Sequence, residues 1–169
     1  ETGVTIMQVD AEMDHGPIIA QLEQAITIDD NLATLTEKLT QKAITLLNQK
    51  LPLYLNNKLK PQPQNHSQAT YTPSYRNLNR NSAYLPWTDL KAAQQGINAA
   101  KIHALIRSLN PEPGAWTHLP AGMTKVNQQE LKILSTNLDS KLETLVIQKV
   151  QLPGKNPISF KQLLSNQKI

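Results

Sequence analysis

A polar stretch rich in proline, asparagine and glutamine, from residue 60 to residue 82, divides this chain into two parts. Its sequence, KPQPQNHSQATYTPSYRNLNRNS, holds three prolines and few aliphatic side chains. Proline withholds a backbone donor and polar side chains add little to a core, so such a stretch continues neither a helix nor a buried strand. We therefore expect one unit over residues 1–59, a linker over 60–82 that lies over a surface, and a second unit over 83–169.

The first part begins with two strand-like segments joined by an acidic loop. Val4–Val9 is short and rich in β-branched residues, and Pro17–Leu22 starts with a proline that the first position of a strand tolerates. The residues between them, 10–16, are acidic and end in glycine, which is typical of a loop. The pattern predicts a hairpin with a wide loop.

An amphipathic helix is predicted after the hairpin. Asp29 or Asp30 is expected to cap it, because a carboxylate accepts hydrogen bonds from the free amides of the first helical turn. Pro52 is expected to bend or end the helix, with a further turn over residues 53–55. The apolar residues at helical spacing are Leu32, Leu35, Leu39, Ala43, Leu46 and Leu47.

The second part combines a helix with short strands, which makes the fold class α+β. Residues 98–109 carry apolar side chains at helical spacing, and Pro111 and Pro113 stop that helix. Apolar clusters separated by turn residues then predict a small antiparallel β unit with a short helical tail at 163–164. The clusters are Leu131–Leu134, Leu145–Val150 and Ile158–Phe160.

Charge is distributed unevenly along the chain. Residues 1–57 hold three basic and eight acidic side chains, a net −5, whereas residues 58–169 hold fourteen basic and five acidic ones, a net +9. This distribution supports two explanations equally. The second part binds a polyanion, or its lysines are simply solvated. The absence of cysteine excludes disulfides and thiolate chemistry, and no apolar run reaches the length of a membrane span.

Asp14 is the first candidate for chemistry. It lies in the loop between the two strands, two residues before Gly16, where the backbone can approach a ligand closely. A carboxylate there can accept a proton from an amine if its surroundings raise its pKa. By spacing alone, a solvated acidic turn shared with Asp10 and Glu12 is the better-supported interpretation. The histidines show no metal-ligand spacing, so we expect no metal.

The run VTIMQVDAEMDHGPIIAQ, residues 4–21, resembles the segment of folate-dependent formyltransferases that ends in a D-x-G-P motif. The resemblance implies a Rossmann-like α/β domain whose last part is formed by residues 1–59. It also implies that Asp14 is catalytic and that 10-formyltetrahydrofolate is the co-substrate. The loop backbone that the resemblance places against the folate pteridine comprises Val9, Asp10, Ala11, Glu12 and Met13.

Four further matches narrow the family. Residues 106–116, IRSLNPEPGAW, resemble the I-R-x-x-N-P-x-P-G-A-W segment in the C-terminal domain of the methionyl-tRNA formyltransferase family. ATY at 69–71, LPW at 85–87 and GKNPIS at 154–159 resemble its interdomain, entry and closing segments. The resemblance implies a tRNA-binding, OB-like β domain over 83–169, and formyl transfer to the amino group of methionyl-initiator-tRNA in translation initiation.

Basic residues of the linker and the second part are candidate tRNA contacts. A phosphate contact needs only positive charge and reach. Lys58, Lys60, Arg76 and Arg80 cluster on the linker, where a solvated side chain is an equally supported interpretation for each. Arg107 lies in the middle of the predicted helix, and a structural ion pair is slightly favoured over RNA binding there.

Two features depart from the family pattern. The asparagine and histidine that stabilise the oxyanion in the family would lie before Glu1, so we expect this chain to be a truncated, inactive fragment. The stretch from Lys125 to Gly154 is short for the family's barrel, so we expect a shortened β-barrel-like domain that does not necessarily close.

Two alternatives stay open at this point. One is a formyltransferase acting on the amino group of a sugar nucleotide, and the other is a non-catalytic RNA-binding module. The partner expected is initiator methionyl-tRNA, with no DNA or membrane partner. We also expect a monomer in the cytoplasm.

Overall fold

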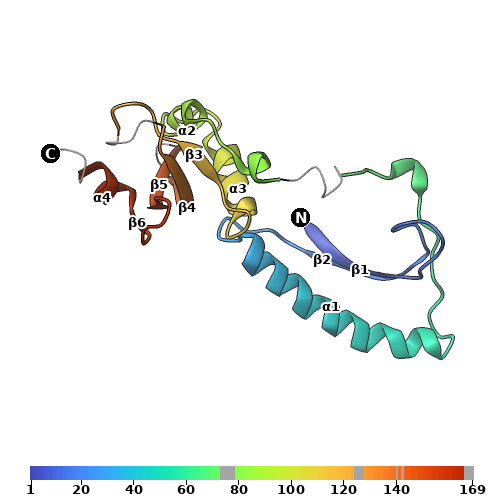
Figure 1. The fold of residues 1–169 in the computed structure, drawn as a ribbon. Helices are drawn as coiled ribbons and strands as arrows, with labels where there is room; N and C mark the ends of the chain where they lie inside the picture. Colours follow the sequence, from blue (N-terminus) through green and yellow to red (C-terminus); the bar gives the residue numbers. More distant parts are fainter. Residues whose placement is uncertain (73–78, 124–127, 140, 142, 166–169) are drawn as a thin grey trace. The chain divides into compact units, whose positions relative to one another are not determined.

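The computed structural model describes residues 1–72, 79–123, 128–139, 141 and 143–165. The chain forms two compact units, Glu1–Pro73 (unit 1) and Ser74–Ile169 (unit 2), each with its own sheet (Figure 1). The boundary between them falls inside the polar stretch 60–82. No helix among these residues is long and apolar enough to cross a membrane.

Unit 1 starts with the hairpin that the sequence predicts. Strand β1 (Thr2–Met7) pairs antiparallel with β2 (Ile18–Gln24), and the register places Val4 opposite Leu22. The register shifts between Ile6 and Met7, at the end of β1 next to the wide loop. The predicted hairpin with a wide loop is therefore confirmed. Strand β1 begins and ends two residues earlier than predicted, and β2 begins one residue and ends two residues later.

Helix α1 (Leu32–Leu55) follows, and Asn31 caps it, so the expectation of an Asp29 or Asp30 cap is wrong. The Asn31 side chain accepts a hydrogen bond from the backbone N–H of Thr34 at 3.0 Å, and the Thr34 hydroxyl accepts one from the Asn31 N–H at 3.0 Å. This reciprocal pair is a capping box, which satisfies the backbone donors of Asn31 and Thr34 at the start of the helix.

Asp30 is buried beside the cap and binds residues on both sides of the helix start instead of capping the helix. Its carboxylate accepts hydrogen bonds from the Thr27 N–H at 2.7 Å and from the Lys38 ammonium at 2.6 Å. The Lys38 ammonium, followed by the Thr27 N–H, holds the pKa of Asp30 well below its usual range. Asp30 thereby ties the turn before α1 to the second turn of the helix.

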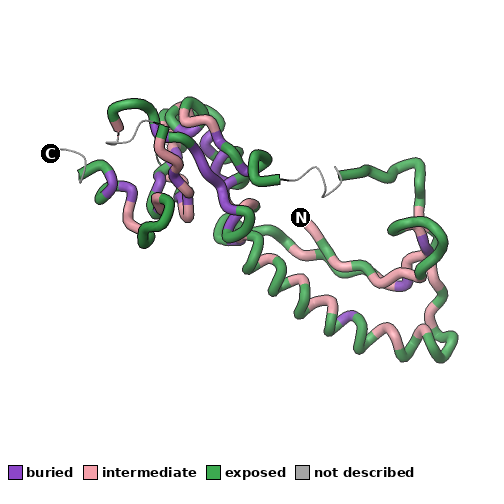
Figure 2. Tube along the Cα trace, viewed as in Figure 1, coloured by how far each residue is buried: buried purple, intermediate pink, exposed green. Residues whose placement is uncertain are grey.

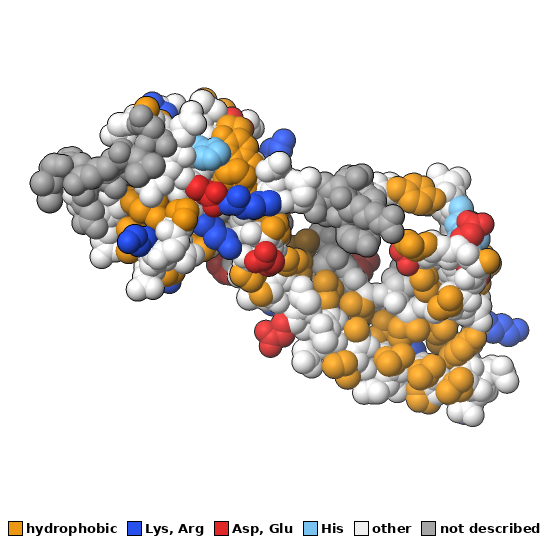
Figure 3. Space-filling model, viewed as in Figure 1, with side chains coloured by type: hydrophobic (Ala, Val, Ile, Leu, Met, Phe, Trp, Pro, Cys, Tyr) orange, Lys and Arg blue, Asp and Glu red, His pale blue; other side chains and the backbone are white. Residues whose placement is uncertain are grey.

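Pro52 lies inside α1, which continues through it to Leu55, the further turn that the sequence allowed. The helix lies along the hairpin, yet most of its apolar side chains stay accessible and Leu46 is its one buried residue (Figures 1 and 2). Large apolar side chains of unit 1 gather on the surface shown in Figure 3. Those exposed on α1 include Leu32, Ile44, Leu47, Leu53 and Leu55.

Unit 2 is built on a four-stranded antiparallel sheet in the order β3-β4-β5-β6. The strands are β3 (Trp116–His118), β4 (Glu130–Asp139), β5 (Thr144–Gln151) and β6 (Ile158–Ser159). The helices are α2 (Trp87–Ala93), α3 (Ala99–Leu109) and α4 (Phe160–Ser165). Among the described residues β3 and β6 are the sheet edges, so the expected barrel is not closed.

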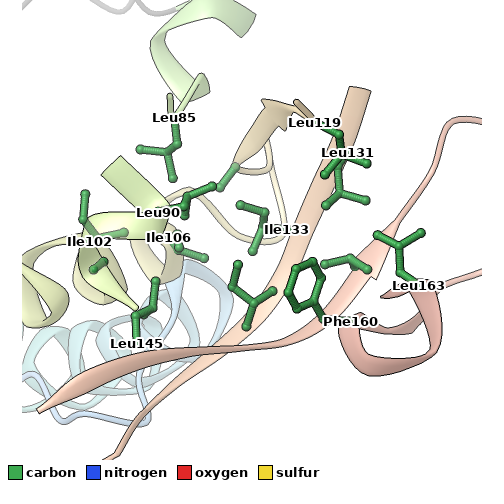
Figure 4. Close-up of a cluster of buried hydrophobic side chains, with 14 of the residues drawn as sticks. Leu85, Leu90, Ile102, Ile106, Leu119, Leu131, Ile133, Leu145, Phe160 and Leu163 are labelled. Carbon is green, nitrogen blue, oxygen red and sulfur yellow. The ribbon is translucent and has the colours of Figure 1, made fainter. Parts of the chain in front are cut away.

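The core of unit 2 lies between the sheet and its helices, where side chains from α2, α3, β4, β5 and α4 converge (Figure 4). Removing these apolar side chains from water stabilises the unit at roughly 25 cal/mol per Å² of buried apolar surface. The members that are at most 2% exposed include Leu90, Ile106, Leu119, Leu131, Ile133, Leu145, Val150 and Leu163.

The predicted helix over 98–109, the three strands and the helical tail are all present in unit 2. The sequence did not predict α2, β3 or the short 3₁₀ helix Arg80–Ala83. Helix α2 is only seven residues long, and β3 only three, so neither is long enough to show a periodic pattern.

We expect Asn31→Ala to lower the unfolding free energy of unit 1 by about 1 kcal/mol, because it removes the side chain that caps α1. Urea unfolding followed by circular dichroism measures this change. Asp29→Ala is the matched control, since Asp29 is exposed and adjacent but does not cap the helix. An equal loss in both variants would contradict the capping role of Asn31.

Candidate active site

Two backbone segments lie in close contact at the base of the loop between β1 and β2, one at Gln8 and the other at Gly16 and Pro17. The Gln8 N–H donates a hydrogen bond to the Pro17 carbonyl at 2.9 Å. Gly16 is buried against Gln8 so closely that a Cβ at this position would come within 1.9 Å of the Gln8 carbonyl oxygen. Only glycine fits there without displacing the base of the loop.

Asp14 lies on this loop with an exposed side chain and a left-handed backbone, at φ +56°. Aspartate adopts this conformation more readily than most residues because its short polar side chain is tolerated there. Among the residues that the structure describes, no hydrogen bond or ion pair occupies the Asp14 carboxylate. The carboxylate is therefore accessible to a group that approaches from solvent.

Contacts of Asp10 and His15 stabilise the same loop. The Asp10 carboxylate accepts a hydrogen bond from the Glu12 N–H at 3.0 Å and contacts His15 Nδ1 at 2.7 Å. The hydrogen bond to Asp10 raises the pKa of His15, and the same bond, followed by that from Glu12 N–H, lowers the pKa of Asp10. The His15 ring stacks on His66, with centroids 3.8 Å apart.

Residues 62–66, which we call the strap, return from the polar stretch to this loop. Gln62 and Ile18 exchange two backbone hydrogen bonds of 2.8 Å, which extends the hairpin by one bridge. The Gln64 side chain donates to the carbonyl oxygens of Asp14, at 2.9 Å, and Gly16, at 2.7 Å. Sequence reasoning missed Gln64 and His66, because no local pattern links them to a loop some fifty residues earlier.

The residues expected to contact folate, Val9 to Met13, form the outer part of the loop. Val9 is 92% exposed and Met13 is 91% exposed, although both side chains are apolar. Both large apolar side chains of this part of the loop are therefore available to a ligand. Asp10, Ala11 and Glu12 between them are also exposed, so this part of the loop is open to a ligand.

The expected tRNA-binding residues are spread over both units. Lys58 and Lys60 are exposed after α1, whereas Arg76 lies outside the described residues. Arg107 is half-buried in the last turn of α3. No group of three or more metal-ligating side chains, within the part of the chain that the structure describes, is arranged to hold a metal ion.

Arg80 is held by three contacts within unit 2. Its guanidinium lies 4.6 Å from the centre of the Trp116 ring and forms an ion pair with Glu130. Its carbonyl accepts a hydrogen bond from the Trp116 indole at 2.8 Å. Tyr84 packs beside the same indole, with ring centroids 4.8 Å apart. Arg80 therefore anchors the start of unit 2, whether or not it also meets a phosphate.

Two family models match this chain. The formyl transferase model covers residues 1–51, which include the hairpin, the Asp14 loop and most of α1, and the formyl transferase C-terminal domain model covers residues 96–144. The chain belongs to the formyltransferase family. The match to the first model includes Asp14 and the loop that carries it.

Among curated relatives, the methionyl-tRNA formyltransferase of Streptococcus pyogenes serotype M4 is 38% identical over 131 residues, which is 78% of this chain and 39% of that protein. This chain thus spans well under half the length of that relative. Relatives from serotypes M18 and M6 of the same species show the same identity and coverage.

Solved structures share the fold at low identity. The methionyl-tRNA formyltransferase of Clostridium thermocellum has a TM-score of 0.52 at 17% identity, over 89% of this chain and 56% of that one. HypX of Aquifex aeolicus, in complex with tetrahydrofolic acid, has a TM-score of 0.63 at 13% identity, over 98% of this chain and 30% of that one. A likely sugar N-formyltransferase of Mycobacterium tuberculosis has a TM-score of 0.51 at 19% identity, over 92% and 55%.

We expect Asp10→Asn to lower the pKa of His15 toward its ordinary value, because the hydrogen bond from His15 to the Asp10 carboxylate is the main cause of its elevation. Titration of the His15 ring protons by NMR measures the shift. Glu12→Gln serves as the control, since Glu12 Oε2 lies 4.0 Å from His15 Nε2 and acts only through charge. A larger shift in the Glu12 variant would contradict this assignment.

Proposed function

We propose that this chain forms the C-terminal part of a methionyl-tRNA formyltransferase, which transfers the formyl group of 10-formyltetrahydrofolate to the amino group of methionyl-initiator-tRNA. The observation that carries the proposal is the braced loop with an accessible Asp14 carboxylate beside exposed Val9 and Met13. Membership of the formyltransferase family and the resemblance of residues 106–116 to the methionyl-tRNA family support it.

Asp14 is the catalytic residue in this proposal. The amine of the aminoacyl ester attacks the formyl carbon, and the bond from that carbon to N10 of the folate breaks as the new C–N bond is completed. The amine loses a proton in this step, and N10 gains one as tetrahydrofolate leaves. Asp14 accepts that proton directly or orients the water that does so, which contributes typically a hundredfold to ten-thousandfold in such reactions. The exposed apolar side chains of Val9 and Met13 flank the folate ring and limit its motion.

An oxyanion develops on the formyl oxygen during the attack and needs hydrogen-bond donors. Removal of one such donor typically costs a hundredfold to a thousandfold in turnover. The family pattern assigns these donors to an asparagine and a histidine that precede the hairpin, and we propose that they belong to a preceding part of the catalytic domain. On its own this chain then binds but does not turn over substrate. The exposed apolar face of α1 fits a contact with that part.

The polar stretch with its flanking residues and the second unit supply the tRNA contacts in this proposal. Residues 58–169 carry a net charge of +9, which attracts a nucleic acid backbone. Lys58, Lys60, Arg76, Arg80 and Arg107 are the proposed contacts. Of these, Lys58 and Lys60 are exposed and form no ion pair with another residue that the structure describes, while Arg80 shares its charge with Glu130.

A sugar-nucleotide amino formyltransferase is the second candidate. The structural likeness to the likely sugar N-formyltransferase of Mycobacterium tuberculosis matches that to the methionyl-tRNA enzyme of Clostridium thermocellum, with TM-scores of 0.51 and 0.52. The fold therefore does not separate the two substrates. The positive charge of the second part favours a polyanion over a small nucleotide.

A chimera tests the proposal. The matching segment of the Streptococcus pyogenes relative is replaced by this chain, and formyl transfer from 10-formyltetrahydrofolate is measured with methionyl-initiator-tRNA and with an amino sugar nucleotide. We expect transfer to the tRNA, and a loss of about a hundredfold or more in kcat for Asp14→Asn with unchanged folate binding.

Asp29→Asn is the matched control, because Asp29 is also an exposed acid but lies outside the loop, and its turnover should stay near that of the parent. Transfer only to the amino sugar would support the second candidate. Salt-sensitive tRNA binding without any transfer by a folded chimera would contradict the enzyme and indicate an RNA-binding module.

A further inference from the structure

We propose that Gln64 is a positioning residue for Asp14, and that the strap, residues 62–66, sets the geometry of the catalytic loop. This inference rests on the proposed function, since it concerns the placement of the proposed catalytic carboxylate. It adds a residue from the polar stretch, outside the D-x-G-P segment and outside both family-model matches, to the active site.

The Gln64 carboxamide contacts the backbone of the D-x-G-P motif at two points. Its Nε2 donates to the carbonyl oxygen of Asp14 at 2.9 Å and to that of Gly16 at 2.7 Å. Met7 Sδ, a weaker acceptor, lies 3.9 Å from the same nitrogen. A carboxamide nitrogen has two hydrogens, which suffice for the two carbonyl oxygens. Since both partners are acceptors, the nitrogen and not the oxygen must face them, which settles the orientation of the side chain chemically.

These two bonds act on the residues whose backbone defines the direction of the Asp14 side chain. Asp14 has a left-handed backbone, which is less favourable than the helical or extended regions for a residue other than glycine. The bonds to the Asp14 and Gly16 carbonyl oxygens hold the Asp14–His15 and Gly16–Pro17 peptide planes. The loop therefore keeps a conformation that Asp14 alone would leave readily.

The strap is fixed on either side of Gln64, so its side chain is held in place before any ligand arrives. Gln62 pairs with Ile18 of β2 through two backbone hydrogen bonds of 2.8 Å. On the other side, the His66 ring stacks on His15 at 3.8 Å with the planes 7° apart. The Asn65 side chain accepts from the Ser67 N–H at 3.2 Å and from its hydroxyl at 2.7 Å, which fixes the turn there.

Such preorganisation has a kinetic consequence. A catalytic group that is misplaced by about 1 Å can cost on the order of a hundredfold in rate while substrate binding hardly changes. The Asp14 carboxylate is exposed, so its own surroundings restrain it little and the backbone must do so. We therefore expect the loss of the Gln64 donors to affect kcat much more than KM.

The test uses two substitutions at Gln64 and a matched control. Gln64→Met keeps the length of the side chain and removes both donors, and Gln64→Glu turns oxygens toward two carbonyl groups. Gln62→Met and Gln62→Glu make the same changes two residues earlier, where the contacts with Ile18 use the backbone and survive the substitution.

Two measurements are made. In the 169-residue chain, the carbonyl ¹³C chemical shifts of Asp14 and Gly16 report the hydrogen bonds from Gln64. In the chimera described above, kcat and KM for folate and tRNA are measured. We expect the carbonyl shifts to move in both Gln64 variants, kcat to fall about tenfold to a hundredfold, and KM to change less than about threefold.

The proposal is overturned if the Gln64 variants match the Gln62 variants in carbonyl shifts or in kcat. A lower melting temperature with unchanged kcat would likewise overturn it, because a merely structural contact behaves in that way. An active parent with unaffected Gln64 variants refutes the positioning role alone. A parent chimera without transfer refutes the proposed function first, and the positioning role with it.

Discussion

The contact between Gly16 and Gln8 is the constraint on which the Asp14 loop depends. At this point two backbone segments approach so closely that a single methyl group would overlap the Gln8 carbonyl oxygen. The adjacent hydrogen bond from Gln8 N–H to the Pro17 carbonyl closes the base of the loop. The ends of the wide loop are thereby fixed close together. Its exposed part can therefore carry polar and apolar side chains that make few contacts of their own.

Three further elements hold this base in place from different parts of unit 1. Helix α1 contributes Tyr54, whose hydroxyl accepts a hydrogen bond from the Gln8 side chain at 2.5 Å. The loop itself contributes the Asp10–His15 contact, and the strap contributes Gln64. Local contacts therefore shape the loop, while contacts from residues distant in sequence fix its direction. That division explains how a fully exposed carboxylate can have a defined position.

Unit 2 contains a similar interaction, in which a side-chain amide from a turn donates hydrogen bonds to the backbone of a strand. Asn110, from the N-P-x-P segment after α3, is buried and donates to the carbonyls of Ile133, at 3.0 Å, and Leu134, at 3.1 Å. The pairing of β4 with β5 is irregular next to Ile133, and Asn110 supplies a donor from outside the strand ladder there. This asparagine belongs to the segment that resembles the family's C-terminal domain, and in the structure it stabilises the fold.

The sequence predicts what is periodic or local in this protein. The hairpin, α1, α3 and the apolar clusters that form β4 and β5 all show a repeat that matches their conformation. The cap at Asn31 was missed because neighbouring carboxylates at 29 and 30 are equally good candidates by type. Asp14 was found through its motif, whereas Gln64 and His66 were not, since their role depends on the strap returning to a loop that the chain left long before.

Hydrogen exchange at the Gln8 amide in Gly16→Ala tests the central claim most directly, namely that the Gly16–Gln8 contact fixes the loop that carries Asp14. The account predicts that the added methyl group breaks the bond to Pro17, so that the Gln8 amide exchanges at least about tenfold faster than in the parent chain, while Gly3→Ala at the far end of the same hairpin leaves it protected. Unchanged protection of Gln8 in Gly16→Ala would contradict the account.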